Sequence, residues 1–357
     1  MSALVRGKLP VSYEPDRTTR GVYLGTTDSG TLILTRSDVR DTLDLAECID
    51  AVERAFRQYG SGRAGAPAVA AVHVPDGGFH IKAGVLSVGN RNYFVAKTNG
   101  NFPGNPEHHG LPTIQGTLVL CDADRGTPLA VMDSTGITAQ RTAAATAVAA
   151  RYLARDSASR LAIIGCGLQG DTHVRALSLV RQIHAITLFD GNPAASKDLA
   201  DRIAQRSDVR VSIASSATEA AAGADICVTC TTSSTFLLDE GDVAVGTLVA
   251  GVGVDSERKK ELSPALLKRA RIVVDVLAQC AAFGDLHHAI EAGAVSAASV
   301  YAELGEVVAG TKRGRLSESE VIVFDSTGMA LQDVAAAAVV YERARSTGRG
   351  MVVRFEH

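Results

Sequence analysis

The chain has 357 residues, of which 46% are hydrophobic and 21% charged, and its formal net charge at neutral pH is −3. This length favours two domains, because a single hydrophobic core stops growing well below it. The balanced charge gives no electrostatic reason to expect a nucleic acid or a membrane surface as a partner. No apolar run is long enough to span a bilayer, and residues 1–15 lack the apolar centre of a signal peptide. We therefore expect a cytoplasmic protein.

Six cysteines are scattered through apolar or helical segments, which is typical of reduced thiols in a reducing compartment. Cys227-x-x-Cys230 is interpreted as part of a buried strand rather than a zinc or redox site, because no second Cys/His pair has metal spacing. Two histidine pairs are interpreted as loop and helix residues rather than ligands: His108-His109 and His287-His288. We therefore expect no metal site.

The first third of the chain predicts a polar arm, one helix and a set of short strands. Residues 1–30 are polar and irregular, and 31–35 read as a strand, after which Ser37 or Asp38 is a candidate cap. Residues 45–59 place apolar side chains on one helical face. Further strands are predicted in four ranges: 68–74, 78–84, 93–98 and 116–121. The first two are joined by Pro75-Asp76-Gly77-Gly78, which predicts a hairpin.

Two lysines lie in these strands between apolar neighbours, Lys82 and Lys97. Taken alone, each can be interpreted as a lysine at a sheet edge whose charged end reaches water. Residues 139–150 predict a helix of very small side chains, in which Arg141 is the only charge of the first turns. A cation at a helix start opposes the helix dipole. A carboxylate ligand or an internal salt bridge would each explain this arginine.

A glycine-rich motif follows the apolar segment 161–164. Its three glycines have the spacing Gly-x-Gly-x-x-Gly and are Gly165, Gly167 and Gly170. In a strand-to-helix turn of this kind, the glycines allow a tight turn and a close approach of backbone to a pyrophosphate. A second predicted strand, 185–189, ends at Asp190, which is 20 residues beyond Gly170. This is where a ribose-binding carboxylate is expected.

Strands and helices then alternate to about residue 309, which predicts a doubly wound parallel sheet. The polar run 231–234 comes just after the predicted strand 224–230. Thr231 is therefore expected in the crevice where such sheets bind their ligand. The chain ends with a strand at 321–325 and a small-residue helix at 329–345, which is expected to pack on the first domain. The fold class is α/β.

The chain also resembles the ornithine cyclodeaminase/mu-crystallin family, over about residues 31 to 345. The resemblance is carried by Lys97…Asn99-Gly100-Asn101-Phe102-Pro103-Gly104-Asn105…Gly110-Leu111-Pro112-Thr113, by Thr138-Ala139-Gln140-Arg141-Thr142-Ala143-Ala144, by Gly165-Cys166-Gly167-Leu168-Gln169-Gly170 and by Asp325-Ser326-Thr327-Gly328. It implies a Rossmann-type domain at 141–320 and an α+β substrate-binding and dimerisation domain made of 1–140 and 321–357. It also implies NAD(P)-dependent chemistry at the α-carbon of a small amino acid or its imine, in a homodimer.

The resemblance further implies roles for individual residues. Lys97 would be the substrate-site lysine, and Arg141 would clamp the α-carboxylate. Thr327 would touch the substrate. The residues implied on the cofactor are Leu168 and Gln169 at the pyrophosphate, Asp190 at the ribose, and Thr113 and Ser326 near the nicotinamide.

The sequence departs from the family pattern in two places. The aspartate that accepts a proton in cyclodeaminases is replaced by Ser233, which stays a catalytic candidate. The family's early arginine would fall in 66–69, where there is none. Lys82 is the candidate to supply that charge to the substrate carboxylate. Both departures weaken a cyclodeaminase reading and leave an oxidoreductase reading intact.

We therefore expect hydride transfer between a nicotinamide and the α-carbon of an amino acid/imine pair. Lys97 would be the acid/base, with a pKa lowered by its positive neighbours Lys82 and Arg141. Asp190 favours NAD over NADP, because a carboxylate repels a 2′-phosphate and no arginine follows in 191–193. Three alternatives stay open: a deaminating cyclisation with recycled NAD, an amino-acid-condensing synthase, and a catalytically silent NADH-binding protein.

Overall fold

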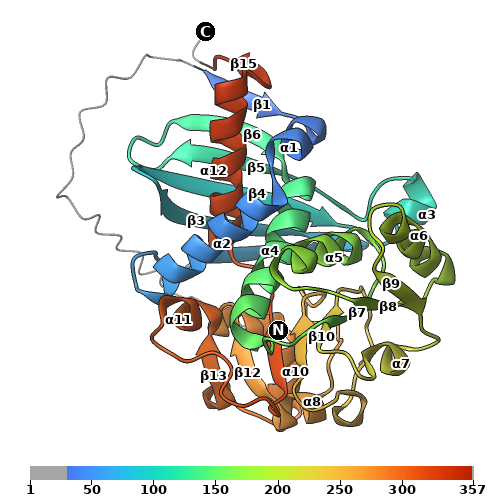
Figure 1. Cartoon of the computed structure of the whole chain (residues 1–357). Helices are drawn as coiled ribbons and strands as arrows, with labels where there is room; N and C mark the ends of the chain where they lie inside the picture. Colours follow the sequence, from blue (N-terminus) through green and yellow to red (C-terminus); the bar gives the residue numbers. More distant parts are fainter. Residues whose placement is uncertain (1–29, 356–357) are drawn as a thin grey trace.

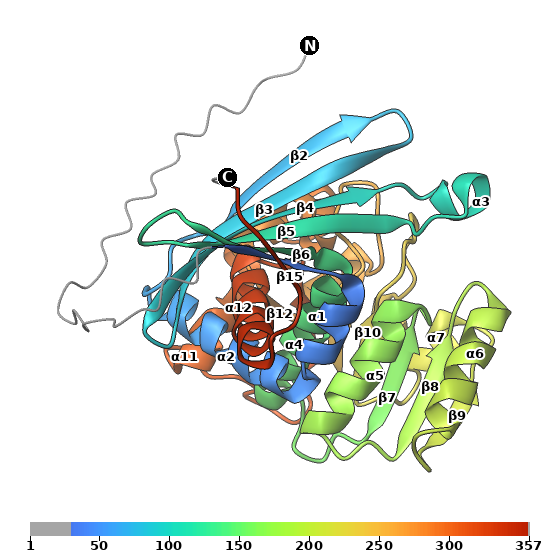
Figure 2. The same cartoon turned by 90° about the horizontal axis from the view of Figure 1, so that it is seen from above.

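The computed structural model describes residues 30–355, so that nearly all of the arm expected at 1–30 lies outside the described residues. Two sheets lie at the centres of two lobes (Figures 1 and 2). The first has seven strands in the order β15-β1-β6-β5-β4-β3-β2. Its strands are β1 Thr31–Leu34, β2 Ala68–Val74, β3 Gly77–Val88, β4 Arg91–Asn101, β5 Ile114–Asp122, β6 Pro128–Asp133 and β15 Met351–Val353.

The first sheet is antiparallel apart from the parallel pair β1–β6. The predicted hairpin is confirmed, because Val74 pairs with Gly77 and leaves a two-residue turn. Strand β6 was not predicted. The helices of this lobe are α1 Arg36–Thr42, α2 Leu45–Gly60 and α3 Asn105–His109. The N-caps are Thr35 for α1 and Asp44 for α2, so Ser37 is not a cap, whereas Asp38 completes the capping box of α1 by accepting from the N–H of Thr35.

Two helices of small, buried residues lie beside the first sheet: α4 Ser134–Leu153 and α12 Ala330–Thr347. Small side chains let these helices approach their neighbours closely, and α12 packs on α2, β3 and β4, as predicted for the C-terminal helix. Asp133 caps α4, which begins earlier than expected. Arg141 is therefore two turns inside the helix, and the helix dipole is not the reason why this cation needs an anionic partner.

The second sheet has eight parallel strands in the order β13-β12-β14-β11-β10-β7-β8-β9. Its elements are β7 Arg160–Ile164, α5 Leu168–Val180, β8 Ala185–Phe189, α6 Pro193–Ala204, β9 Arg210–Ile213, α7 Ala217–Ala221, β10 Ile226–Thr229, β11 Leu248–Gly251, α8 Pro264–Arg269, β12 Arg271–Val274, α9 Leu277–Phe283, α10 Asp285–Glu291, β13 Val300–Glu303, α11 Leu304–Ala309 and β14 Ile322–Asp325. This is the predicted doubly wound sheet. The strand order reverses between β7 and β10, where such sheets bind ligands.

The strand β14 belongs to this second sheet, where it lies between β11 and β12. The expectation that the segment from residue 321 joins the first domain was therefore wrong for the strand. All four residues of β14 are buried. A short strand with a run of apolar residues fits the middle of any sheet, so its sequence does not tell which one it joins. The rest of the predicted domain division stays a prediction.

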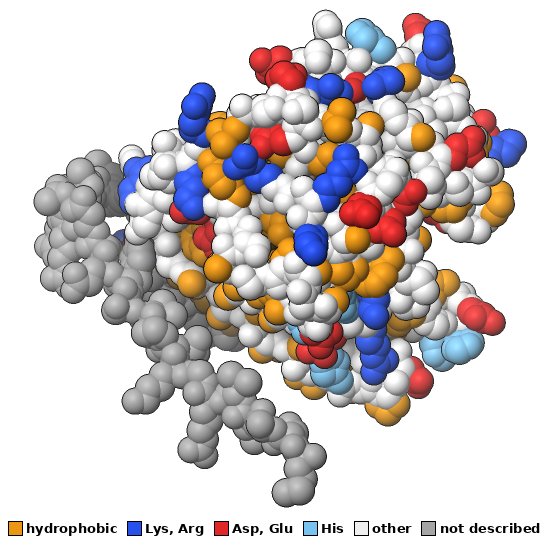
Figure 3. All heavy atoms as spheres, turned by 90° about the horizontal axis from the view of Figure 1, so that it is seen from below, with side chains coloured by type: hydrophobic (Ala, Val, Ile, Leu, Met, Phe, Trp, Pro, Cys, Tyr) orange, Lys and Arg blue, Asp and Glu red, His pale blue; other side chains and the backbone are white. Residues whose placement is uncertain are grey.

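The face of the molecule seen from below mixes acidic, basic and apolar side chains, and a notch indents one edge of its outline (Figure 3). Among residues 30–355, no helix combines the length and the apolar character that a membrane span requires.

Candidate functional site

The glycine motif forms the turn between β7 and α5, and each of its glycines meets a different steric demand. Gly165 has a φ of +105°, and a Cβ there would lie 2.7 Å from the carbonyl oxygen of Cys230. A Cβ on Gly170 would collide with the carbonyl oxygen of Gly165. A Cβ on Gly167 would meet nothing within 4 Å. The first and third glycines thus allow tight backbone packing, whereas the second leaves open space in front of the turn.

This open space is the place where a pyrophosphate fits. Gly167 is the N-cap of α5 and provides no side-chain cap, so the helix presents its first N–H groups uncapped. A cavity of about 340 Å³ lies beside the turn and is lined by Cys166, Gly167, Leu168, Asp171, Ala195, Asp198 and Arg202. Leu168 is exposed there. The residues present therefore fit the nicotinamide dinucleotide expected from the sequence.

Asp190 is placed beside the same turn. One of its carboxylate oxygens accepts a hydrogen bond of 2.7 Å from the backbone N–H of Cys166, and the other accepts one of 2.8 Å from Asn192. The carboxylate is thus held against the glycine turn. Arg202, which the sequence reading missed, lines the cavity but lies 3.6 Å from Asp171. Arg206 also pairs with Asp171, at 2.8 Å, so Asp171 is neutralised by two arginines, whereas Asp190 is held by backbone N–H groups.

Lys97, Arg141 and Asp333 form a buried ionic cluster between β4, α4 and α12. Nζ of Lys97 donates to Oδ1 of Asp333 at 2.8 Å, and Nε of Arg141 donates to the same oxygen at 3.0 Å. The exposed fractions are 2% for Lys97, 5% for Arg141 and 0% for Asp333. Nη1 of Arg141 also donates to Gln332 at 3.0 Å. Arg141 therefore has an internal salt bridge, and Asp333 and Gln332 are site residues that the sequence reading missed.

Lys82 lies next to this cluster and is tied to the loop that follows β14. It pairs directly with Lys97 across β3 and β4. Its Nζ donates to the backbone oxygens of Thr327 and Gly328, each at 2.7 Å. A Cβ on Gly328 would collide with the guanidinium of Arg141. The segment 326–328 is thus packed against both cations, which brings the family motif at 325–328 to the lysines of the first sheet.

The hydroxyl groups of this segment are held by Asp275, another residue that the sequence reading missed. Oγ of Ser326 donates to Asp275 at 2.9 Å, and the N–H of Gly328 donates to the same carboxylate at 2.6 Å. Oγ1 of Thr327 donates to it at 3.4 Å. Asp275 directly follows the buried strand β12. An acidic residue after an apolar run is the sequence feature by which it could have been predicted.

Burial dominates the electrostatics of the cluster. Desolvation, followed by the charge of Arg141, lowers the pKa of Lys97 to about 7, although Asp333 opposes this shift. The same two causes lower the pKa of Lys82. Burial by itself would raise the pKa of Asp333, but Lys97 and Arg141 hold it below its ordinary value. The direction expected for Lys97 is found, with burial rather than like charge as its larger cause.

The remaining candidates form hydrogen bonds with groups other than Lys97, Arg141 and Asp333. Thr231 donates its N–H and its hydroxyl to the buried Glu261, at 2.6 and 2.8 Å. Ser233 donates its hydroxyl to the carbonyl oxygen of Thr235 at 2.7 Å, and its own carbonyl oxygen accepts from the backbone N–H of Lys260 at 2.9 Å. Thr113 accepts from the N–H of Phe102 through its carbonyl oxygen at 2.8 Å. Gln169 donates nothing to the cluster either, and its carbonyl contacts His173.

Comparisons with known proteins agree with this geometry. The sequence model described as the ornithine cyclodeaminase/mu-crystallin family matches residues 29–348. An alanine dehydrogenase of Archaeoglobus fulgidus is 38% identical over 325 residues, which are 91% of this chain and 98% of that protein. The Delta(1)-pyrroline-2-carboxylate reductase of Thermococcus litoralis, solved with NADH and L-proline, has a TM-score of 0.87 at 32% identity and covers 90% of this chain and 100% of its own.

A third relative is the iminosuccinate reductase of Paracoccus denitrificans, solved with NAD+. Its TM-score is 0.81 at 32% identity, and the alignment covers 91% of this chain and 99% of the other. The α/β fold of the present chain is thus that of proteins solved with NAD or NADH.

Proposed function

The chain belongs to the ornithine cyclodeaminase/mu-crystallin family, and from this premise we propose that it is an NAD(H)-dependent oxidoreductase that interconverts a small α-amino acid and its imine. The observation that carries the proposal is the buried cluster of Lys97 and Arg141, which shares one carboxylate, Asp333. Burying Lys82, Lys97 and Arg141 around the single carboxylate of Asp333 costs folding free energy unless an anionic ligand joins them. The α-carboxylate of an amino acid is such a ligand.

Arg141 is the proposed clamp for this carboxylate. Its Nε and Nη1 are engaged by Asp333 and Gln332, and among the described residues no hydrogen bond is made by Nη2. The internal partners fix the plane of the guanidinium, so that the remaining N–H groups are oriented before the substrate binds. Lys82 is held by two carbonyl oxygens and retains one donor, with which we propose that it assists at the same carboxylate.

Lys97 is the proposed acid/base. With a pKa of about 7, both of its protonation states are populated near neutral pH. The neutral amine would accept the proton from the substrate nitrogen during amino acid oxidation. The ammonium would donate that proton to the nitrogen during imine reduction. Oγ1 of Thr138 lies 3.5 Å from Nζ and helps to orient it.

The bound dinucleotide would supply the hydride acceptor or donor. We propose that Gly165, Gly167 and Gly170 with Leu168 and Gln169 hold its pyrophosphate, and that Asp190 holds its adenosine ribose. Thr113, Thr231 and Ser326 would lie along its nicotinamide end, and Thr327 beside the substrate. We propose NAD rather than NADP, because the carboxylate of Asp190, held against the glycine turn, would repel a 2′-phosphate.

The cyclodeaminase alternative requires a proton acceptor where Ser233 stands. A neutral serine whose hydroxyl donates to Thr235 does not replace a carboxylate in that role, which speaks against the lyase. Ser233 therefore stays a candidate only for hydrogen bonding in the crevice. A catalytically silent NADH-binding protein would not require a buried lysine with a lowered pKa. The condensing synthase would form the same oxidised intermediate, but it requires a second amine as a substrate.

We also propose that the chain forms a homodimer through the edge strand β2. Every residue of β2 is exposed, including Val69, Val72 and Val74. The hairpin formed by β2 and β3 projects at the rim of the first sheet (Figure 2). An exposed apolar edge strand pairs readily with another strand. Val72→Asp should convert the dimer to a monomer in sedimentation.

The cytoplasm stays the expected location, since all six cysteines are free thiols.

The test of the proposed function is an assay in both directions. NADH oxidation is followed with cyclic imines, and with 2-oxo acids plus ammonia or methylamine. NAD+ reduction is followed with L-amino acids, including ornithine and lysine. Turnover in either direction supports the oxidoreductase. NADH binding without turnover, accompanied by release of ammonia from an amino acid, would support the cyclodeaminase instead.

A further inference from the structure

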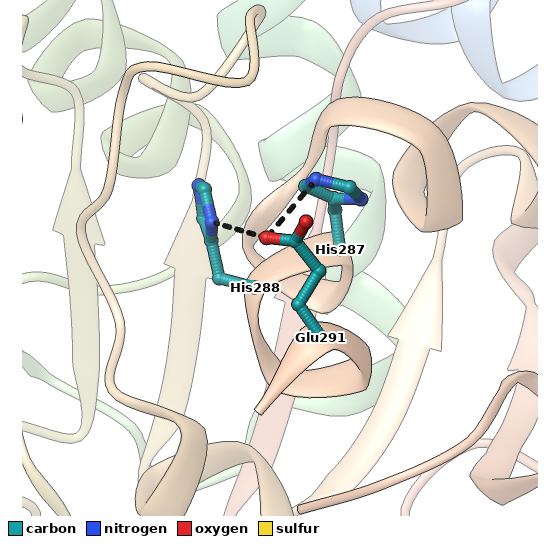
Figure 4. Close-up of side chains that lie close together, drawn as sticks. All are labelled: His287, His288 and Glu291. Atoms are coloured by element: carbon teal, nitrogen blue, oxygen red, sulfur yellow. Dashed lines mark ion pairs between the residues drawn. The ribbon is translucent and has the colours of Figure 1, made fainter. Parts of the chain in front are cut away.

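Three side chains of α10 bring metal-binding atoms close together: His287, His288 and Glu291. Nε2 of His287 lies 3.4 Å from Oε2 of Glu291, and Nδ1 of His288 lies 3.9 Å from the same oxygen. One ligand atom from each residue lies within 4.8 Å of the others. Figure 4 shows the carboxylate between the two imidazole rings. A single carboxylate oxygen is thus flanked by two ring nitrogens.

The hydrogen bonds on the far side of the rings decide which nitrogens carry protons. Nε2 of His288 lies 2.7 Å from the backbone oxygen of Lys259, and Nδ1 of His287 lies 3.2 Å from that of Ala281. A carbonyl oxygen only accepts hydrogen bonds, so both of these nitrogens are donors. In the neutral rings, the nitrogens that face Glu291 then carry lone pairs. Metal-binding histidines are oriented by this same kind of outer hydrogen bond.

We propose that His287, His288 and Glu291 form a binding site for a divalent transition metal ion such as Zn²⁺. Two imidazole nitrogens and one carboxylate oxygen are a donor set that suits zinc. With metal–ligand distances of about 2.0–2.2 Å, the ligands of a tetrahedral ion are about 3.3–3.6 Å apart. The separations around Glu291 are already close to these values. The side chain of Glu291 is 65% exposed and is free to adjust.

A cation accounts for the arrangement better than an ion pair does. His288 is buried, its side chain being 5% exposed, and its ring packs edge-on against Phe236. The nitrogen–oxygen separations of 3.4 and 3.9 Å at Glu291 are longer than an ordinary N–H···O hydrogen bond of about 2.7–3.2 Å, so the three groups do not form a tight ion pair. Without a cation, the neutral rings and the carboxylate would direct lone pairs at one another. A metal ion satisfies all three donors together and leaves a fourth position for water.

The site would also connect α10 to the loop that contains Lys259. The carbonyl that orients His288 belongs to Lys259, whose side chain forms an ion pair of 2.8 Å with Asp255. A metal that fixes the His288 ring therefore fixes the backbone of this loop as well. We expect Zn²⁺ to raise the melting temperature of the protein, because an ion that binds only the folded state stabilises it.

The test is direct metal binding to the full-length chain without a histidine tag, after removal of metals with EDTA. Zn²⁺ is titrated in competition with a chromophoric chelator, and Co²⁺ is used to record the absorption bands of the bound ion. His287→Ala and Glu291→Gln remove one ligand each at solvent-accessible positions. The matched control is the double variant His108→Ala/His109→Ala, which removes the exposed histidine pair of α3.

The proposal predicts one Zn²⁺ per chain and an absorption spectrum of four- or five-coordinate Co²⁺. The two ligand variants should bind Zn²⁺ at least about tenfold more weakly, since even the loss of an outer-shell partner costs about 10–100-fold. The control should bind as tightly as the unmodified chain. Fluorescence titration with NADH reports whether each variant is folded. The proposal is overturned by binding below one ion per chain, or by equal Zn²⁺ affinity in folded His287→Ala.

Discussion

Lys82 and Lys97 face each other directly across the antiparallel strands β3 and β4, and both are buried. Like charges in directly opposite positions destabilise a sheet. The structure offsets this cost by two carbonyl oxygens at Lys82 and by Asp333 at Lys97. An arrangement that is costly for stability and held in place by distant parts of the chain is typical of a functional site.

Replacement of Lys97 by Met should abolish turnover and spare cofactor binding. The change removes the proposed acid/base, for which a loss of about 10²–10⁴-fold in kcat/KM is expected. The glycine turn that would hold the cofactor lies on the other sheet, so the Kd for NADH should stay unchanged. Steady-state kinetics and NADH fluorescence measure the two effects. Lys97→Arg is the control that keeps the charge. It should also be inactive, because its guanidinium does not release a proton, and an active Lys97→Arg protein would argue against the acid/base role.

The pH dependence should follow the pKa of Lys97, which is about 7. Amino acid oxidation needs the neutral amine, so kcat/KM should rise as the pH rises through about 7. Imine reduction needs the ammonium, so kcat/KM should fall over the same range. Asp333→Asn removes the carboxylate that favours the charged lysine, and both profiles should move to lower pH. An unchanged midpoint in that variant would exclude Lys97 as the titrating group.

The glycine turn offers a matched pair of substitutions. Gly167→Ala adds a methyl group where nothing lies within 4 Å, at a φ of −77° that alanine also adopts. The free energy of unfolding should change by less than about 0.5 kcal/mol. The Kd for NADH should rise at least about tenfold, because the added methyl group keeps the pyrophosphate away from the backbone of the turn. Gly170→Ala collides with the backbone of Gly165 and should destabilise the protein by about 1–3 kcal/mol. Chemical denaturation and NADH titration separate the two results. Equal NADH affinity in Gly167→Ala would place the pyrophosphate elsewhere.

Cofactor choice should depend on the charge of Asp190. Asp190→Ser should raise kcat/KM with NADPH relative to NADH by about tenfold or more, because a like charge near the 2′-phosphate is removed. Asp190→Asn is the control that keeps the size of the side chain and its acceptor oxygen for Cys166 N–H. If charge is the cause, both variants relax the discrimination. If neither variant does, Asp190 does not contact the ribose.

The sequence was sufficient where the deciding signal is local. The glycine spacing, the Pro75-Asp76 turn and the apolar runs depend on neighbouring residues, and they predicted the parallel sheet and the hairpin. The partner of Lys97 could not be found this way. Asp333 is 236 residues away in an alanine-rich helix, where an acidic residue reads as solvent-exposed. The placement of β14 failed for the same reason, since strand pairing is decided by the whole sheet.

The histidines of α10 illustrate a related limit. A His-His-x-x-Glu run in a sequence gives no information about ring orientation, and we read the pair as helix residues. Only the carbonyl oxygens of Lys259 and Ala281 determine that the nitrogens facing Glu291 carry the lone pairs. Backbone contacts across 29 and 6 residues therefore decide a chemical property of the side chains.

The most direct test of the proposed function follows the hydride itself. The enzyme is incubated with NADH that carries deuterium at both C4 positions of the dihydronicotinamide and with the imine that turns over in the assay panel. The product amino acid is then analysed by mass spectrometry and NMR. The proposed function predicts one deuterium at the α-carbon for each NADH consumed, and none in the Lys97→Met reaction. An amino acid product without deuterium at the α-carbon would contradict it.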